Sequence, residues 1–214
     1  MLKGVIFDMD GVLVNSEPFI CEAAIRMFAE HGLTVQPEDF LPFVGAGEDR
    51  YIGGPAAKYV YPIDIPRDKA RTYEIYDEIV KGRLEPLRGV HEFIGKCRAK
   101  GLKLAVASSA DLVKIKINLR EIKLPMNTFD VIVSGDDVVH KKPDPEIFLA
   151  AAQKLGLKPE ECLVVEDAVN GVKAAKSAGS KCLGITSSFT AEQLVGADWI
   201  APDLADAPDE ALEW

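Results

Sequence analysis

Two aspartates, Asp8 and Asp10, stand two residues apart directly after the apolar run "GVIF". If the extended geometry of that run persists, their side chains lie on one side of the chain while Met9 points the other way. Two carboxylates so close raise one another's pKa unless a cation compensates them. A solvated pair at the edge of a loop is the simpler interpretation, and the remainder of the chain decides between the two.

A second acidic pair ends another apolar run, because Glu166 and Asp167 close the stretch "CLVVED". Carboxylate oxygens are the ligands that Mg²⁺ takes, together with waters and a substrate phosphate. The two acidic pairs together therefore favour a site for a hard divalent cation, and Mg²⁺ suits it.

Two further strand ends carry groups that can bind an anion. Ser108 and Ser109 end "LAVASS", and their hydroxyls and nearby N–H groups can hold phosphate oxygens. In "HKKPDPEIF", Asp144 as cap and Pro145 at the first helical position predict a helix start that places Lys142. A lysine beside acidic groups and a metal balances charge on a phosphoryl group. Each signal alone is typical of a turn or a solvated lysine, but four in order favour a phosphate site.

The elements that must position these residues follow from the apolar pattern. Continuous apolar runs, each followed by a helical pattern, predict a doubly wound α/β fold with a parallel sheet; they are "GVIFD", "LKLAVASS", "FDVIVSG", "CLVVED" and "KCLGITS". The strand signal disappears between them, where helical periodicity over 19–31 and 66–81 predicts an inserted unit. We therefore expect residues 1–15 and 84–214 to form the α/β core domain and residues 16–83 a helical cap domain over the two aspartates. Trp199 is expected on the sheet edge, followed by an exposed acidic tail.

Composition limits the partners. The chain has 214 residues and a net charge of −9, and its lysines and arginines are spread along it, so no surface for nucleic acid is expected. No apolar run approaches the roughly 20 residues of a membrane span, and no partner membrane is expected. The N-terminus shows no leader pattern, and we expect a cytoplasmic monomer whose partner is a small molecule.

Four short motifs, "DMDGV", the serines 108 and 109, "KP" at 142 and 143, and "ED" at 166 and 167, carry a resemblance to a known family. In this order and spacing they resemble the pattern of the haloacid dehalogenase superfamily over nearly the whole chain. The inserted helices resemble the cap of the subgroup that contains β-phosphoglucomutase and many small-molecule phosphatases. The resemblance implies a Rossmann-like core and phosphoryl-transfer chemistry.

The resemblance also implies roles. Asp8 would be the nucleophile that forms an aspartyl-phosphate, and Asp10 the general acid for the leaving oxygen and then the general base for water. Ser108 and Lys142 would hold the phosphoryl oxygens. Mg²⁺ would be bound by Asp167, Asp8 and the main-chain carbonyl of Asp10, with Glu166 assisting at the metal.

Hydrolysis and mutase activity both remain open. Asp10 favours phosphoryl transfer over dehalogenation, since a halide leaving group needs no proton. A cap histidine and a cap arginine that mark β-phosphoglucomutase correspond here to Ile20 and Glu48, which weakens the mutase alternative, although Arg50 lies close to Glu48. A non-catalytic phosphate-binding regulatory module is a third alternative, but no motif residue is lost.

The loop "GAGEDR" is the expected substrate contact in the cap. Gly45, Glu48 and Arg50 are its candidate residues, and Ser109 is the candidate in the core; an ordinary glycine-rich connection is the simpler interpretation of the loop. The expected function is a Mg²⁺-dependent phosphatase of a small phosphomonoester such as a sugar phosphate.

Overall fold

The first strand, β1 (Gly4–Phe7), lies in the middle of a six-stranded sheet with the order β3-β2-β1-β4-β5-β6. The computed structural model describes residues 1–45 and 47–214. All strand pairs are parallel, and the other strands are β2 (Lys103–Ala107), β3 (Val131–Val133), β4 (Cys162–Glu166), β5 (Lys181–Ile185) and β6 (Trp199–Ala201). The predicted doubly wound parallel sheet is confirmed.

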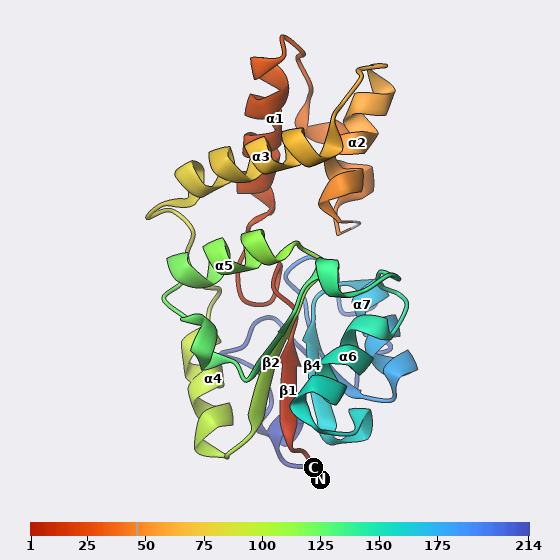
Figure 1. The fold of residues 1–214 in the computed structure, drawn as a ribbon. Coiled ribbons are helices and arrows are strands. Elements are labelled where there is room, and N and C mark those ends of the chain that lie inside the picture. The colour runs from red at the N-terminus through yellow and green to blue at the C-terminus, as the bar shows by residue number, and fades with distance from the viewer. Residues whose placement is uncertain (46) are drawn as a thin grey trace.

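Helices cover both faces of this sheet, which is why its strands are apolar throughout. Val5 and Phe7 belong to the apolar core on the face of α4 (Val90–Ala99) and α5 (Leu112–Glu121). Ile6 points the opposite way, into the core under α6 (Glu146–Leu155) and α7 (Val169–Ala178). The two helix pairs lie on opposite sides of the strands in Figure 1.

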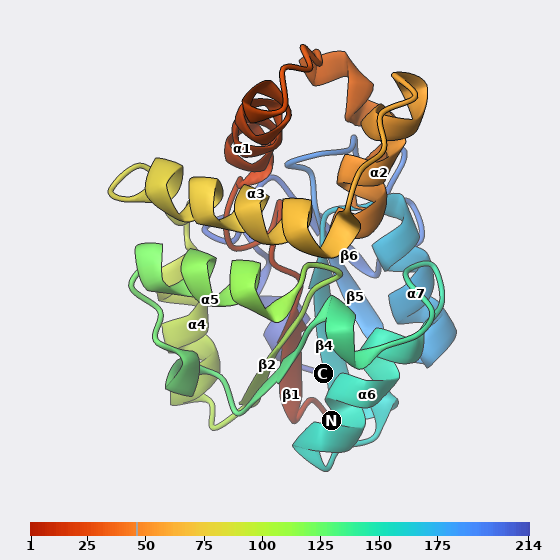
Figure 2. The ribbon, with the colours of Figure 1, turned by 45° about the horizontal axis from the view of Figure 1, so that its top comes forward.

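Three more helices lie above the carboxyl ends of the strands (Figures 1 and 2): α1 (Glu17–Glu30), α2 (Glu48–Lys58) and α3 (Ile65–Val80). The helices α1 and α3 agree with the predicted ranges 19–31 and 66–81. The sequence did not predict α2, because two glycines and Pro55 interrupt its pattern. Tertiary packing of buried Tyr51, Ile52 and Ala56 holds this helix in spite of its poor propensity.

The two connections between these helices and the sheet run side by side. The Leu87 N–H donates to the Leu13 carbonyl at 3.0 Å. Further along, α3 is tied to α5 by the Tyr76 hydroxyl, which donates to Asn118 Oδ1 at 2.5 Å in a buried position. These contacts fix α3 above the sheet, while the division into a core and a cap domain stays a prediction.

The C-terminal segment differs from the expected exposed tail. Trp199 does lie at the sheet edge, in β6. Beyond it Leu204, Ala211 and Leu212 are buried, and the Leu2 N–H donates to the Trp214 carbonyl at 2.7 Å. The acidic side chains of this segment pair with basic ones of α4 and its approach, so the segment is part of the fold.

The helix after Lys142 begins one residue later than expected. The first residue of α6 is Glu146, with Pro145 in the N-cap position, and the carboxylate of Asp144 accepts a hydrogen bond from the Glu146 N–H at 2.9 Å. Asp144 thus satisfies a free N–H at the helix start, as predicted, from one position further out. In the described residues, no helix combines the length and apolar character needed to cross a bilayer.

Candidate active site

A pocket of about 540 Å³ lies between the carboxyl ends of the strands and the inserted helices α1 and α2. It brings together nearly all the predicted site residues: Asp8, Asp10, Gly45, Glu48, Ser108, Ser109, Lys142, Glu166 and Asp167. Arg50 is exposed and lines an adjoining outer cavity of about 910 Å³, which shares Glu48 and Lys142 with the pocket. Ala46 of the predicted loop is outside the described residues.

Backbone pairing places the residues that come from strand ends. The Asp8 N–H donates to the Val165 carbonyl at 3.0 Å, and the Ser108 N–H donates to the Val133 carbonyl at 3.1 Å. Each residue thus continues the ladder by one step beyond its strand, and parallel strands end at the same edge of the sheet. Buried Met9 points into the core, as the alternation predicted.

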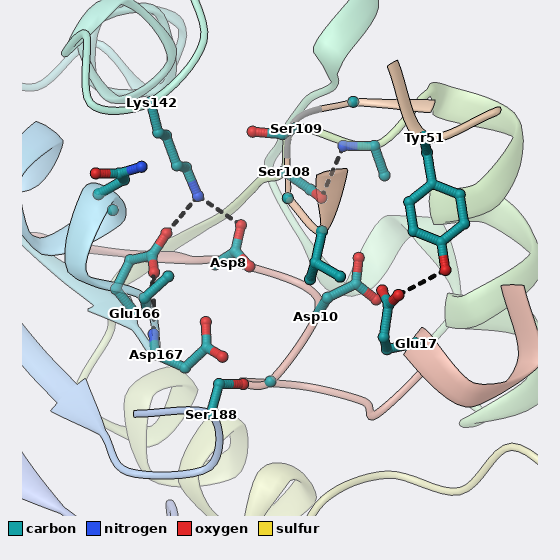
Figure 3. A pocket seen from close by; sticks show the side chains of 18 of the residues that line it. Asp8, Asp10, Glu17, Tyr51, Ser108, Ser109, Lys142, Glu166, Asp167 and Ser188 are labelled. Carbon is teal, nitrogen blue, oxygen red and sulfur yellow. Dashed lines mark hydrogen bonds and ion pairs between the residues drawn. The ribbon is translucent and has the colours of Figure 1, made fainter. Parts of the chain in front are cut away.

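Lys142 is the cation at the centre of the site. Its ammonium donates to Asp8 Oδ1 at 2.6 Å and also to Glu166 (Figure 3). The side chains of Lys142 and Asp8 are only 9% and 11% exposed. Burial alone would lower the pKa of Lys142, but the charges of Asp8 and Glu166 raise it above its ordinary value, so the lysine stays charged.

Glu166 is engaged on both oxygens. Oε1 faces Lys142, and Oε2 accepts hydrogen bonds from the N–H groups of Asp167 at 3.0 Å and Ala168 at 2.9 Å. The carboxylate fits there because Gly171 of α7 has no Cβ; a Cβ would lie 1.9 Å from its carboxyl carbon. Glu166 therefore holds Lys142 in place, a role that the sequence did not indicate beside the predicted one of assisting at the metal.

Three carboxylates, those of Asp8, Glu166 and Asp167, share the one ammonium of Lys142, so this end of the site has excess negative charge. Burial, partly offset by Lys142, raises the pKa of Asp8 well above its ordinary value. Burial and the neighbouring charge of Glu166 raise the pKa of Asp167 to about 7. Gly11, with φ of +77°, brings the backbone so close that a Cβ would lie 1.9 Å from Asp167 Oδ2. Hard oxygen donors with too few positive charges fit a divalent cation such as Mg²⁺.

The side chain of Asp10 points away from this carboxylate group. Its Oδ1 accepts from the Ser16 hydroxyl and its Oδ2 from the Lys114 ammonium at 3.0 Å. Both side-chain oxygens are therefore occupied away from Asp8 and Asp167, and the prediction assigned only the main-chain carbonyl of Asp10 to the metal. The side chain faces the part of the pocket under the inserted helices.

The serines lie on the other side of Asp8 from Lys142 (Figure 3). The hydroxyl oxygen of buried Ser108 accepts a hydrogen bond from the Ala110 N–H at 3.2 Å, so its proton is free to be donated into the pocket. Ser109 lines the pocket beside it. Hydroxyls and an ammonium on the two sides of Asp8 can bind the oxygens of a phosphoryl group.

Sequence reasoning missed several lining residues, including Lys114, Glu17, Tyr51 and Ser188. Lys114 comes from α5, Glu17 and Tyr51 from the inserted helices, where the Tyr51 hydroxyl donates to Glu17 at 2.6 Å, and Ser188 from the loop after β5. The spacing of Lys114 and Asn118, four residues apart on a helix with buried isoleucines, was a signal of a polar face turned inward.

Another group of potential metal ligands lies outside the pocket. Among residues 1–45 and 47–214, one set of three ligand atoms within 4.8 Å of one another belongs to His140, Asp144 and Glu146. Its closeness has a structural cause, because Glu146 accepts hydrogen bonds from the N–H groups of Val139 at 2.9 Å and His140 at 2.8 Å. The group orders the loop before α6.

Comparison with known proteins places the chain among relatives of one kind. Residues 2–179 match the profile of the haloacid dehalogenase-like hydrolases. The chain is 42% identical over 96% of its length to Protein SUPPRESSOR OF QUENCHING 1, chloroplastic, of Arabidopsis thaliana, but it spans only 20% of that protein. It is 36% identical to a Phosphorylated carbohydrates phosphatase of Thermotoga maritima, covering 88% of this chain and 87% of the relative.

A solved structure matches the fold over almost its whole length. It is a mutant of CbbY from Rhodobacter sphaeroides in complex with xylulose-(1,5)bisphosphate, with a TM-score of 0.85, 26% identity and coverage of 96% of both chains.

Proposed function

This chain belongs to the haloacid dehalogenase-like hydrolase family, and from that premise we propose that it is a Mg²⁺-dependent phosphatase of a small phosphorylated metabolite. At the coarser level it is a phosphoric monoester hydrolase that acts on phosphorylated small molecules, as its family and its relatives named as phosphatases indicate. The observation that carries the proposal is Lys142 clamped between Asp8 and Glu166, with Ser108, Asp10 and Asp167 in the same pocket.

The first step is a displacement at phosphorus. An oxygen of the Asp8 carboxylate forms a bond to phosphorus while the bond from phosphorus to the leaving oxygen breaks, which leaves the phosphoryl group on Asp8. Lys142 and the Ser108 hydroxyl hold the phosphoryl oxygens in line. Asp10, which faces the inserted helices, gives a proton to the leaving oxygen.

The second step returns the enzyme to its starting state. Asp10, now ionised, takes a proton from a water molecule, whose oxygen attacks phosphorus and releases Asp8 with inorganic phosphate. The inserted helices exclude other water from the pocket. Asp8 and Asp167 are the side chains that would hold Mg²⁺. When bound, the ion supplies positive charge that keeps these carboxylates ionised and stabilises charge on the phosphoryl group.

The pocket disfavours the phosphomutase alternative. A mutase must grip a second phosphate at the leaving-group end, and in the described part of the chain the lining cations are Lys114 and Lys142, both of which are already ion-paired. Arg50, which lies close to Glu48 in the sequence, lines the outer cavity. Hydrolysis is therefore the proposed reaction. We propose, further, residues 1–15 and 84–214 as core, 16–83 as cap, and a cytoplasmic monomer.

The test is phosphate release from a panel of small phosphomonoesters with Mg²⁺, run beside conversion of β-glucose 1-phosphate to glucose 6-phosphate. We expect release that EDTA abolishes and added Mg²⁺ restores. The Asp8→Asn variant should fold like the wild type and release no phosphate, because asparagine keeps the shape but is not a nucleophile. Activity in that variant, or isomerisation without release, would contradict the proposal.

A further inference from the structure

The part of the pocket under the inserted helices contains a buried carboxylate that lacks a partner. Glu48 begins α2 and is 8% exposed. Its Oε2 is buried and, among the described residues, no group hydrogen-bonds to it. An unsatisfied buried acceptor is costly, and it needs an explanation such as a donor supplied by a ligand. Because Glu48 lines the same pocket as Asp10, that ligand would be the leaving group of the substrate.

The neighbouring cation is already committed. Lys114, from α5, lies 3.0 Å from Asp10 Oδ2 and 3.6 Å from Glu48 Oε1, and its side chain is 5% exposed. It neutralises two carboxylates that would otherwise repel each other. If it turned to a phosphate, both carboxylates would remain in a poorly solvated place with no counter-charge.

The surrounding charge is negative. Glu17 adds a third carboxylate on this side of the pocket. The Tyr51 hydroxyl donates its hydrogen bond to Glu17 and is therefore not available to a phosphate. Three carboxylates therefore face the leaving group with one shared ammonium among them. A second phosphate placed here would meet repulsion, whereas a hydroxyl or another hydrogen-bond donor would satisfy Glu48 Oε2.

We propose, on the basis of the phosphatase function above, that Glu48 and Lys114 form a selectivity pair for the leaving group. The pair accepts phosphomonoesters whose leaving group carries hydrogen-bond donors and no second anionic group, and it rejects bisphosphates. In this respect the chain would differ from the CbbY relative that holds xylulose-(1,5)bisphosphate. Lys114 acts by positioning Glu48 and Asp10, and Glu48 contacts the substrate.

The experiment measures binding without turnover. In the Asp8→Asn background with Mg²⁺, calorimetry gives the dissociation constants of fructose 6-phosphate, fructose 1,6-bisphosphate and inorganic phosphate. We expect the monophosphate to bind at least about tenfold more tightly than the bisphosphate, since one pocket group changes preference by factors of this size. Adding Glu48→Gln should shrink that ratio about tenfold, because it removes one of the carboxylates that repel the second phosphate.

Two controls identify the cause. Glu78→Gln removes an exposed carboxylate of α3 that forms no ion pair in the described part of the chain, and it should leave the ratio unchanged. Inorganic phosphate has no leaving group, so its affinity should be the same with and without Glu48→Gln, which also shows that the variant is folded.

The outcomes separate the two proposals. An unchanged ratio in Glu48→Gln, or no binding of either sugar phosphate, would overturn the selectivity pair. A wild-type protein that releases no phosphate while the ratio shifts as expected would refute the phosphatase proposal and leave the selectivity pair supported.

Discussion

Replacing Gly171 by alanine should lower the free energy of unfolding of the protein, although the same change normally stabilises a helix. Gly171 is in α7, and alanine is favoured over glycine inside a helix by about 0.5–1 kcal/mol. At this position, however, the new Cβ would lie 1.9–2.2 Å from the carboxyl atoms of Glu166. The Glu166 carboxylate, which holds Lys142, must therefore move to avoid the new Cβ.

The size of the effect follows from the bonds of that carboxylate. Glu166 accepts from the N–H groups of Asp167 at 3.0 Å and Ala168 at 2.9 Å, and it pairs with Lys142. Hydrogen bonds to a charged group contribute about 1.5–3 kcal/mol each. Losing the two N–H bonds costs at least about 3 kcal/mol, and the helix gain offsets about 1 kcal/mol. We therefore expect the free energy of unfolding to fall by at least about 2 kcal/mol, with a decrease in Tm of about 4–8 °C.

The matched control is Gly95→Ala. Gly95 is an exposed residue within α4, and a Cβ there meets nothing within 4 Å. This variant should show only the helix gain of about 0.5–1 kcal/mol. Urea unfolding followed by circular dichroism gives both changes, and phosphate release should fall only in Gly171→Ala, because Lys142 shifts. If both variants were stabilised alike, the account of how Glu166 is held would be refuted.

Two further predictions concern the inserted helices. Bonds from the Lys58 ammonium, a backbone N–H and the Tyr59 hydroxyl lower the pKa of Asp39 to about 2. Ionised Asp39 therefore stabilises the fold above its ordinary pKa of 3.8, and this contribution disappears as the pH falls to about 2. The free energy of unfolding that Asp39→Asn loses, measured by urea unfolding, should therefore become smaller over that pH range. A loss that became larger would contradict the prediction. Tyr76→Phe should lower the free energy of unfolding by about 1–2 kcal/mol, because Asn118 Oδ1 loses its buried donor; an unchanged urea midpoint would show that water replaces the hydroxyl.

The sequence predicted those elements of the fold that leave a clear local pattern of apolar residues. Five of the strands are apolar runs, because helices cover both faces of the sheet. The sixth, β6, was not predicted because its apolar run has only three residues between Asp198 and Pro202, too short to indicate a strand. α2 escaped because its glycines and Pro55 contradict its helical state, which only packing overrides.

The site residues also fall into two groups, those that the sequence predicted and those that it did not. Asp8, Ser108 and Asp167 were predictable, since the ends of parallel strands meet at one edge whatever the details of packing. Lys114 and Glu48 were not predictable as a pair, because they come from helices whose relative placement depends on tertiary contacts. The orientation of the Asp10 side chain toward Lys114 has the same origin.

The central position of β1 in the sheet should make folding of this protein slow. Lys142 contacts Asp8 across 134 positions of the sequence, and Lys114 contacts Asp10 across 104. Both neighbours of β1 in the sheet come after the inserted helices, so the first strand synthesised waits with both edges open. Closing such long loops limits folding rates and exposes strand edges to aggregation. After dilution from urea, the rate at which phosphate release recovers therefore reports when β1 pairs with its two neighbours. Circular dichroism reports the formation of the helices, which precedes this pairing.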